Sequence, residues 1–342
     1  FNVSATAFTF AGTNSIVNYG DFTINNGSSV TMTSNNTSSA ITNYGTFYAG
    51  TSNSSCVITA LGNQPKINNS STTVSGTTYN GIFYLGSTSI IYPSSTNFLM
   101  TNSSSCTFTL QSDAFGSAAI GAVPNGANPS PSLVGTYNVE RYFQGSTTYS
   151  ATTRRWVERG YRIISSAVHN TTQVNSNNVY GLNYIVGATV GHTTDATSAS
   201  NAFVTGCTGG STSGGNPSLY LYNESYTPSN QTFTDGNFIG ITNITNSSTT
   251  GSIGCSDGGT YSIPVGTGVF FFFRGAATNW STRTLNPFIA PEDVTLTSTG
   301  SINQQSVTVK DWYSPTSSYL GRTGSGQGGN HVVRGFNMVG NP

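Results

Sequence analysis

Side chains that could perform acid–base or nucleophilic chemistry are scarce in this sequence. Only 6% of the 342 residues are charged, with 11 basic side chains, 11 acidic side chains and three histidines. The first 134 residues contain three charged residues, which are Asp21, Lys66 and Asp113. Glycoside hydrolysis needs paired carboxylates, and general acid–base catalysis needs titratable groups that lie together. The sequence therefore predicts a protein that is not an enzyme, with no catalytic residues.

The four cysteines suggest an extracellular protein without a metal or cofactor site. No CxxC pair or Cys/His cluster occurs, so we expect neither a zinc centre nor any other cofactor. Spacing alone allows three pairings of four cysteines. Cys207 and Cys255 both lie in Gly/Ser/Thr-rich stretches, and we expect a disulfide between them. We interpret Cys56 and Cys106, which lie 50 residues apart, as buried apolar residues of a repeat.

A short aromatic signature recurs through the first third of the chain. Each copy has a Phe after an Asn/Tyr/Gly cluster, then a short strand-like run, a small polar turn and a second run. The first two copies are 25 residues apart, and the fourth is truncated. The copies are Asn18-Tyr19-Gly20 before Phe22, Asn43-Tyr44-Gly45 before Phe47, Tyr79-Asn80-Gly81 before Phe83, and Asn97-Phe98.

This period predicts a parallel β-solenoid over residues 1–120, with about 25 residues per coil. Equivalent residues should stack, with Asn or Thr ladders at the corners. An inserted loop with a shortened partner would explain the irregular later spacing, and a β-sandwich with coincidental echoes is the alternative. The residues expected in the stack are Phe22, Phe47, Phe83, Phe98, Val30, Cys56 and Cys106.

The first ten residues alternate apolar and polar side chains. This segment could donate a strand to a neighbouring subunit, or it could form the first coil of its own solenoid. The candidate strand-donor residues are Phe1, Val3, Phe8 and Phe10.

Composition changes after a Pro/Gly/Asn-rich stretch at 121–137, which we interpret as a linker or cap. Irregularly spaced strand-like runs then predict an antiparallel, β-sandwich-like domain over 138–342. Basic and acidic residues alternate near its start, which favours a structural ion-pair cluster over a binding site for anionic sugars. The cluster consists of Glu140, Arg141, Arg154, Arg155, Glu158, Arg159 and Arg162.

An ordered series of motifs runs through residues 138–342: Val139–Phe143, Arg154–Trp156, Tyr161–Ser166, Ser218–Glu224, Gly266–Gly275, Thr295–Gly300 and Gly335–Pro342. This series resembles a module of very large Bacteroidota surface proteins, which are exported by type IX secretion and described as β-strand-repeat or gliding-adhesin-like. The resemblance implies an extracellular or cell-surface location and no reaction. Because the family reads on beyond the last Pro, the chain is expected to be a fragment of a longer chain or a processed piece.

The remaining features set the expected partners. Zero net charge argues against nucleic acid, and no apolar run approaches the length of a membrane helix. We expect a structural protein or adhesin, which could be the subunit of a surface filament and could carry glycans. It would bind copies of itself, or cell-surface and glycan partners. The alternatives are a carbohydrate-binding module with Trp280 and Trp312 as candidate glycan contacts, and a polysaccharide-acting enzyme.

Overall fold

The computed structural model describes the following residues: 1–3, 7–11, 15–25, 27–33, 41–51, 55–61, 64–124, 132–153, 155–170, 173–174, 177–185, 219–222, 238–243, 252–255, 260–276, 290–304 and 307. Within these ranges the protein is essentially all-β, and the single helical element is the 3₁₀ turn η1 (Asn183–Ile185). The all-β class predicted from the sequence is confirmed.

The chain divides into two compact units. Unit 1 comprises Phe1–Phe143 and Thr295–Ser306, and unit 2 comprises Gln144–Val294 and Val307–Pro342. The domain limits predicted from the sequence stay a prediction.

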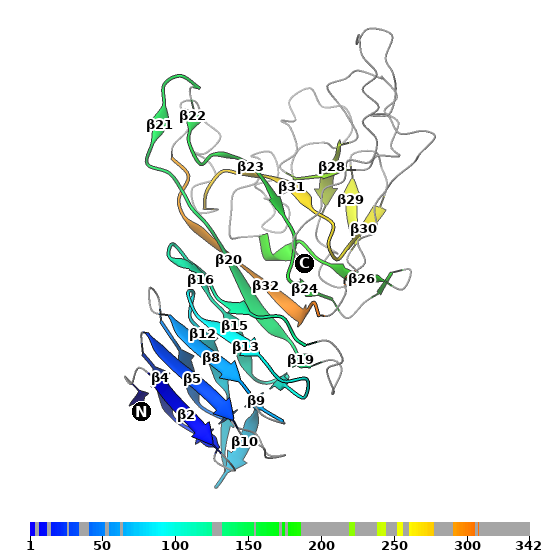
Figure 1. The fold of residues 1–342 in the computed structure, drawn as a ribbon. Coiled ribbons are helices and arrows are strands. Elements are labelled where there is room, and N and C mark those ends of the chain that lie inside the picture. The colour runs from blue at the N-terminus through cyan, green and yellow to red at the C-terminus, as the bar shows by residue number, and fades with distance from the viewer. Residues whose placement is uncertain are drawn as a thin grey trace. The chain divides into compact units, whose positions relative to one another are not determined.

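Three sheets build unit 1 (Figure 1). Sheet A runs in the order β1 (Asn2–Val3), β4 (Asp21–Ile24), β7 (Thr46–Ala49), β12 (Ile82–Leu85), β15 (Thr107–Leu110), β20 (Tyr137–Phe143) and β32 (Val294–Ile302). Sheet B contains β2 (Ala7–Ala11), β5 (Ser28–Thr33), β8 (Cys56–Ala60), β13 (Ile90–Pro93) and β18 (Ala119–Ile120). Sheet C contains β3 (Ile16–Asn18), β6 (Ile41–Asn43), β9 (Lys66–Asn69), β14 (Leu99–Asn102) and β19 (Leu133–Gly135).

The chain visits these sheets in turn, and the strands of sheets A, B and C up to β20 pair in parallel with their counterparts in the neighbouring passes. We call one visit to sheets C, A and B a pass. In sheet A, Asp21 pairs with Thr46, and Thr46 pairs with Ile82. The second step is longer because the antiparallel hairpin β10 (Ser71–Val74) and β11 (Thr77–Asn80) is inserted there. The smaller ribbon β16 (Ser112–Asp113) and β17 (Gly116–Ser117) lies after β15.

Alternation of side chains explains why these short strands form a core. In β5, Ser28, Val30 and Met32 are buried, whereas the residues between them are half-buried. Successive side chains of a strand point to opposite faces, so one face of each strand contributes to the interior. β-branched and aromatic residues favour this pleated, half-buried surface.

Unit 2 contains an antiparallel sheet. Its strand order is β23 (Gly160–Ile164), β31 (Val269–Phe273), β27 (Leu219–Tyr222), β28 (Phe238–Asn243), β29 (Ser252–Cys255), β30 (Thr260–Pro264), β26 (Asn177–Tyr180) and β25 (Gln173–Val174). The ribbon β21 (Tyr149–Ser150) and β22 (Arg155–Trp156) and the short strand β24 (Val168–His169) complete the described elements. The predicted sandwich stays a prediction.

The predicted register of the fourth repeat copy is wrong. Phe108 pairs with Phe83 in sheet A, whereas Phe98 precedes β14 of sheet C. The inserted hairpin β10–β11 does lengthen the second step, as expected, but no shortened partner follows, since Ile82 pairs with Thr107 at an offset of 25 residues, as in the first step. The polar turn before β15 is longer than the two-residue turns of the first two copies. The spacing of the signature therefore does not mark the Phe that enters sheet A in this copy.

Candidate functional site

A column of buried asparagines ties the passes of unit 1 together. Asn18, Asn43, Asn69 and Asn102 end the four successive strands β3, β6, β9 and β14 of sheet C. Each Nδ2 donates to the Oδ1 of the next asparagine, over 2.8 Å, 2.8 Å and 2.7 Å. The last Nδ2, that of Asn102, donates to the carbonyl oxygen of Thr136. We call this set the asparagine column, and its donation runs in one direction only.

Each asparagine also closes its own corner. Asn43 Nδ2 donates to the carbonyl oxygens of Gly45 and Ile82, over 2.9 Å and 3.0 Å, so it joins its own turn to the next pass. The corner leaves no room for a side chain, because a Cβ at Gly45 would collide with the backbone of Gly20. This explains the recurring Asn-x-Gly in the signature.

A second column, of aromatic rings, runs through the interior of unit 1. Phe22, Phe47, Phe83 and Phe108 stack with centroid distances of 4.9, 4.7 and 4.3 Å and interplanar angles of 12° or less. Tyr137 ends the aromatic column by packing its ring edge-on against Phe108. Its hydroxyl donates to carbonyl oxygens of Met100 and Val134, and burial raises its pKa above the ordinary range of tyrosine.

The other residues expected in the stack lie in different places. Val30 and Cys56 are buried in sheet B, where Cys56 pairs with Ser28 and Val30 with Ile58. Burial raises the pKa of the Cys56 thiol to about 12, so this group stays a protonated, apolar side chain at neutral pH. Cys106 is half-buried in the turn before β15, and both cysteines are free thiols. Phe98 is fully buried, although it lies outside the aromatic column.

An exposed aromatic corner lies beside the asparagine column. The ring of Tyr19, which is 46% exposed, stacks on Tyr44 at 5.0 Å. Tyr79, from the hairpin β10–β11, packs edge-on against Tyr19 at 5.7 Å. Three phenol groups thus gather at one surface, where they could contact a flat, uncharged ligand. The signature contained these tyrosines, but it did not indicate that they meet.

The candidate strand-donor residues pair within the chain itself. β1, with Val3, pairs in parallel with β4, and β2, with Phe8 and Phe10, pairs with β5. The ring of Phe1 is 79% exposed and lies 5.4 Å from that of Phe22. Strand donation to another subunit stays a prediction.

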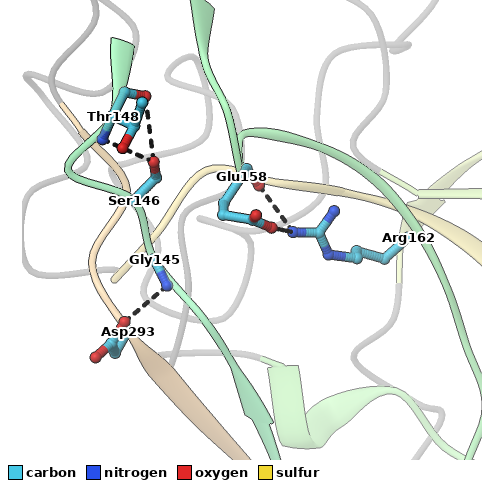
Figure 2. A network of polar contacts seen from close by, with 6 residues as sticks. All are labelled: Gly145, Ser146, Thr148, Glu158, Arg162 and Asp293. Atoms are coloured by element: carbon cyan, nitrogen blue, oxygen red, sulfur yellow. Dashed lines mark hydrogen bonds and ion pairs between the residues drawn. The ribbon is translucent and has the colours of Figure 1, made fainter. Parts of the chain in front are cut away.

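In the described part of the charged stretch of unit 2, Arg162 and Glu158 form a close ion pair (Figure 2). Arg162 donates to the carboxylate of Glu158 over 2.7 Å and also to the Glu158 carbonyl oxygen. Both side chains are about one-third exposed, so this pair contributes less than about 1 kcal/mol. Nearby, the Asp293 carboxylate accepts a hydrogen bond from the backbone N–H of Gly145 over 2.7 Å.

Two arginines of unit 2 pack against aromatic rings. Arg274 is 9% exposed, and its guanidinium lies 4.5 Å from the ring centroid of Phe272. Arg159 is also buried and lies 5.9 Å from the same ring. Burial lowers the pKa of Arg274 to about 10, although it remains charged at neutral pH. Arginine is used here for its flat, weakly hydrated face.

Two members of the predicted ion-pair cluster belong to unit 1. The carboxylate of Glu140 accepts the backbone N–H of Ser112 over 3.0 Å, while Arg141 donates to the carbonyl oxygen of Glu140. Desolvation raises the pKa of the Glu140 carboxyl, and the hydrogen bond from Ser112 partly opposes this shift. The residues of the predicted cluster therefore make contacts of different kinds.

Several predicted site residues lie outside the described part of the chain. These are Cys207, Trp280, Trp312 and Arg154. For Phe10, Arg155 and Cys255 the backbone is described but the side chain is not. The Cys207–Cys255 disulfide and the tryptophan glycan contacts stay predictions.

Within the described ranges, no three His, Cys, Asp or Glu side chains lie together in a way that could hold a metal ion. The same residues include no helix with the length and apolarity needed to cross a membrane. Comparison with protein families, curated proteins and solved structures finds no match. The two columns of unit 1 and the exposed tyrosine corner are accordingly the features from which we argue a function.

Proposed function

We propose that the protein is a non-enzymatic structural protein or adhesin of the cell exterior, and that it serves as a building unit of a surface filament. In this proposal unit 1 is a β-solenoid in which each pass forms one coil, and unit 2 acts as a spacer or docking module. The observation that carries the proposal is the pair of uninterrupted columns, which join every pass of unit 1 to the next.

The chemistry of the columns suits a mechanical role. Amide ladders and stacked rings repeat at the spacing between neighbouring strands, so each contact supports the next one along the column. Unit 1 contains almost no charge that pH or salt could perturb, and its only basic residues, at which trypsin-like proteases cleave, are Lys66 and Arg141. A protein that remains folded outside the cell benefits from both properties.

Electron microscopy of purified full-length protein, with hydrogen-exchange mass spectrometry, tests the proposal. We expect filaments with an axial repeat near the subunit length and slow exchange throughout the strands of unit 1. Monodisperse particles at all concentrations would contradict the filament. Rapid exchange in β7, β12 and β15 would contradict the solenoid.

A second candidate function is carbohydrate binding, which the exposed tyrosine corner favours. Tyr19, Tyr44 and Tyr79 present aromatic faces among hydroxyl and amide side chains, as a neutral sugar ring would require. Glycan-array binding that is lost in Tyr19→Ala but kept in Tyr92→Ala, another exposed tyrosine, would support it. Binding that depends instead on Trp280 or Trp312 would move the site to unit 2.

A further inference from the structure

Two pairs of tyrosines stack face to face on the outside of unit 1. Tyr19 and Tyr44 follow corresponding asparagines of the asparagine column, and their ring centroids lie 5.0 Å apart with an interplanar angle of 25°. Tyr48 and Tyr84 are partners in the register of sheet A, with ring centroids 5.2 Å apart and an angle of 14°. The first pair joins the pass of β4 to that of β7, and the second joins the pass of β7 to that of β12. We call these two pairs the tyrosine stacks.

The rings of the tyrosine stacks are accessible to solvent, unlike those of the aromatic column. Tyr19 is 46% exposed, and Tyr44, Tyr48 and Tyr84 are half-buried. Tyr48 and Tyr84 alternate along their strands with buried phenylalanines, so they point to the outer face of sheet A. An oxidant that reaches unit 1 therefore meets phenol groups at its surface.

Few other readily oxidised side chains of unit 1 are accessible. Met32, Met100 and Cys56 are fully buried, and Cys106 is a half-buried thiol. The three tryptophans of the chain all belong to unit 2. Tyrosine is thus the main surface group of unit 1 from which an oxidant can take a single electron.

Face-to-face stacking is the geometry in which two tyrosyl radicals couple. Loss of one electron and of the hydroxyl proton turns a phenol into a neutral phenoxyl radical, whose unpaired electron is shared by the oxygen and by the ortho and para ring carbons. This electron occupies an orbital perpendicular to the ring. Two such radicals therefore bond through their faces, and a pair that is already stacked has its reacting orbitals aligned.

Tyr79 provides a comparison within the same exposed corner. Its ring centroid lies 5.7 Å from that of Tyr19, which is close to the distance within a tyrosine stack. The two ring planes are at 82°, however, so the face of one ring meets the edge of the other. Orientation, rather than distance, separates this pair from the stacked pairs.

We propose that the tyrosine stacks are sites of oxidative cross-linking, at which an ortho carbon of one ring bonds to an ortho carbon of the other to give a dityrosine. The oxidant is hydrogen peroxide acting through a peroxidase-type one-electron catalyst. The two phenols give up two electrons and their two hydroxyl protons, and the peroxide accepts them, loses its O–O bond and becomes two waters. One C–C bond forms between the rings. Two C–H bonds break, and these hydrogens move to the ring oxygens, which restores both phenols.

The cross-links would tie three consecutive passes of unit 1 together covalently. A covalent link between distant positions restricts the unfolded chain, as a disulfide does. This modification goes beyond the proposed function and does not depend on it, because both stacks lie within one chain. A protein that forms no filament would be cross-linked in the same way.

Peroxidase treatment of dilute full-length protein tests the proposal. Thiols are alkylated first, and the protein is then oxidised with hydrogen peroxide and a haem peroxidase. The monomer is digested with pepsin and analysed by mass spectrometry. We expect linked peptides across both tyrosine stacks, each lighter by two hydrogen atoms than the sum of its parts. A link between Tyr19 and Tyr79 should be about tenfold less abundant, because that pair lacks the face-to-face orientation.

Two variants and an unfolded sample show whether stacking selects the linked pairs. Tyr44→Phe keeps the ring but removes the phenol, so the link to Tyr19 across that stack should disappear while the other stack still reacts. Tyr92→Phe alters another exposed tyrosine and should leave both links unchanged. In urea-unfolded protein the preference of Tyr19 for Tyr44 over Tyr79 should be lost, because the orientation of the rings is lost.

Added N-acetyltyrosine amide reports whether the oxidant works. If this compound couples while neither stack does, the proposal is wrong. It is equally wrong if, in the folded protein, Tyr19 links to Tyr79 as often as to Tyr44, and this comparison needs no variant that might misfold. Monodisperse particles in electron microscopy together with both links would remove the filament and leave the cross-linking sites in place.

Discussion

The two units use polar side chains in opposite ways. In unit 1 the buried asparagines are neutral amides that bond to identical amides one pass away. In unit 2 two buried arginines, Arg159 and Arg274, lie against the ring of Phe272. Repetition allows unit 1 to satisfy its buried asparagine side chains with one another, whereas the arginines of unit 2 each have their own aromatic contact.

This difference can be measured in one sample. The three tryptophans, Trp156, Trp280 and Trp312, all belong to unit 2, so tryptophan fluorescence reports on that unit. Hydrogen exchange in peptides from residues 64–124 reports on unit 1. Because the chain has two units, a single unfolding free energy would not describe it, and each variant is read in its own unit.

The largest effect is expected from the aromatic column. Phe83→Ala should lower the unfolding free energy of unit 1 by about 3–5 kcal/mol, because Phe83 is fully buried between Phe47 and Phe108. Its neighbour Tyr84 stacks on Tyr48 at the outer face and is half-buried. Tyr84→Ala is the matched control and should cost less than half as much. If hydrogen exchange showed that both substitutions lower the unfolding free energy of unit 1 equally, the aromatic column would not be the core of this unit.

The asparagine column should have the next largest effect. Asn69→Ala removes the amide that donates to Asn102 Oδ1 and to the carbonyl oxygens of Gly81 and Thr107. The Gly81 oxygen keeps the N–H of Thr107 as a donor, whereas Asn102 Oδ1 loses the donor that joins it to the column. An unsatisfied buried group costs about 1–3 kcal/mol, so we expect about 3 kcal/mol in total. Asn68→Ala, on the opposite face of β9, should cost less than about 1 kcal/mol. Hydrogen exchange measured at increasing urea concentrations gives the stability of unit 1 in each variant. If the two variants were equally stable, the asparagine column would not hold the passes together.

In unit 2 the corresponding comparison is between two arginines. Arg274→Met should lower the stability of unit 2 by about 1–2 kcal/mol, because it removes a buried cation–π contact. Arg162→Met removes a more exposed ion pair and should cost less than about 1 kcal/mol. Urea unfolding followed by tryptophan fluorescence measures both variants. A larger loss in Arg162→Met would show that ion pairing, rather than aromatic packing, organises unit 2.

The smallest effect concerns pH. Folding raises the pKa of Glu140, so the folded state holds this proton more tightly than the unfolded state does. The stability contributed by the protonated form is present below the unfolded pKa and is lost as pH rises through the folded pKa. Glu140→Gln should remove this decline and leave unit 1 slightly more stable at neutral pH. Hydrogen exchange at pH 4 and pH 7 checks it, and an unchanged slope in the variant would contradict the assignment.

The features that could be predicted from the sequence are those that follow from composition or from the short repeat of unit 1. The all-β class follows from composition, and the alignment of Phe22 with Phe47 and Phe83 follows from a fixed relation between each Phe and the Gly before it. It failed for the fourth copy, because the turn between Asn102 and Phe108 is longer and contains no Tyr-Gly. In the third copy the member of the asparagine column is Asn69 rather than Asn80, because the hairpin β10–β11 lies between Asn69 and the corner glycine Gly81.

The site features missed from the sequence are those that depend on contacts between distant segments. Tyr79 meets Tyr19 across 60 positions, and Gln304 reaches Leu133 across 171. No period connects such pairs, because they do not repeat. The Arg274–Phe272 contact is local, but the sequence could not show that Arg274 would be buried there.

The hairpin β10–β11 leaves the asparagine column unbroken, although it interrupts a corner. That corner is consequently a place where evolution or an engineer can exchange sequence freely, provided that the flanking Asn69 and Gly81 stay in place. Epitopes, binding loops or whole small domains grafted between Ser71 and Asn80 would be displayed at a fixed height along the scaffold.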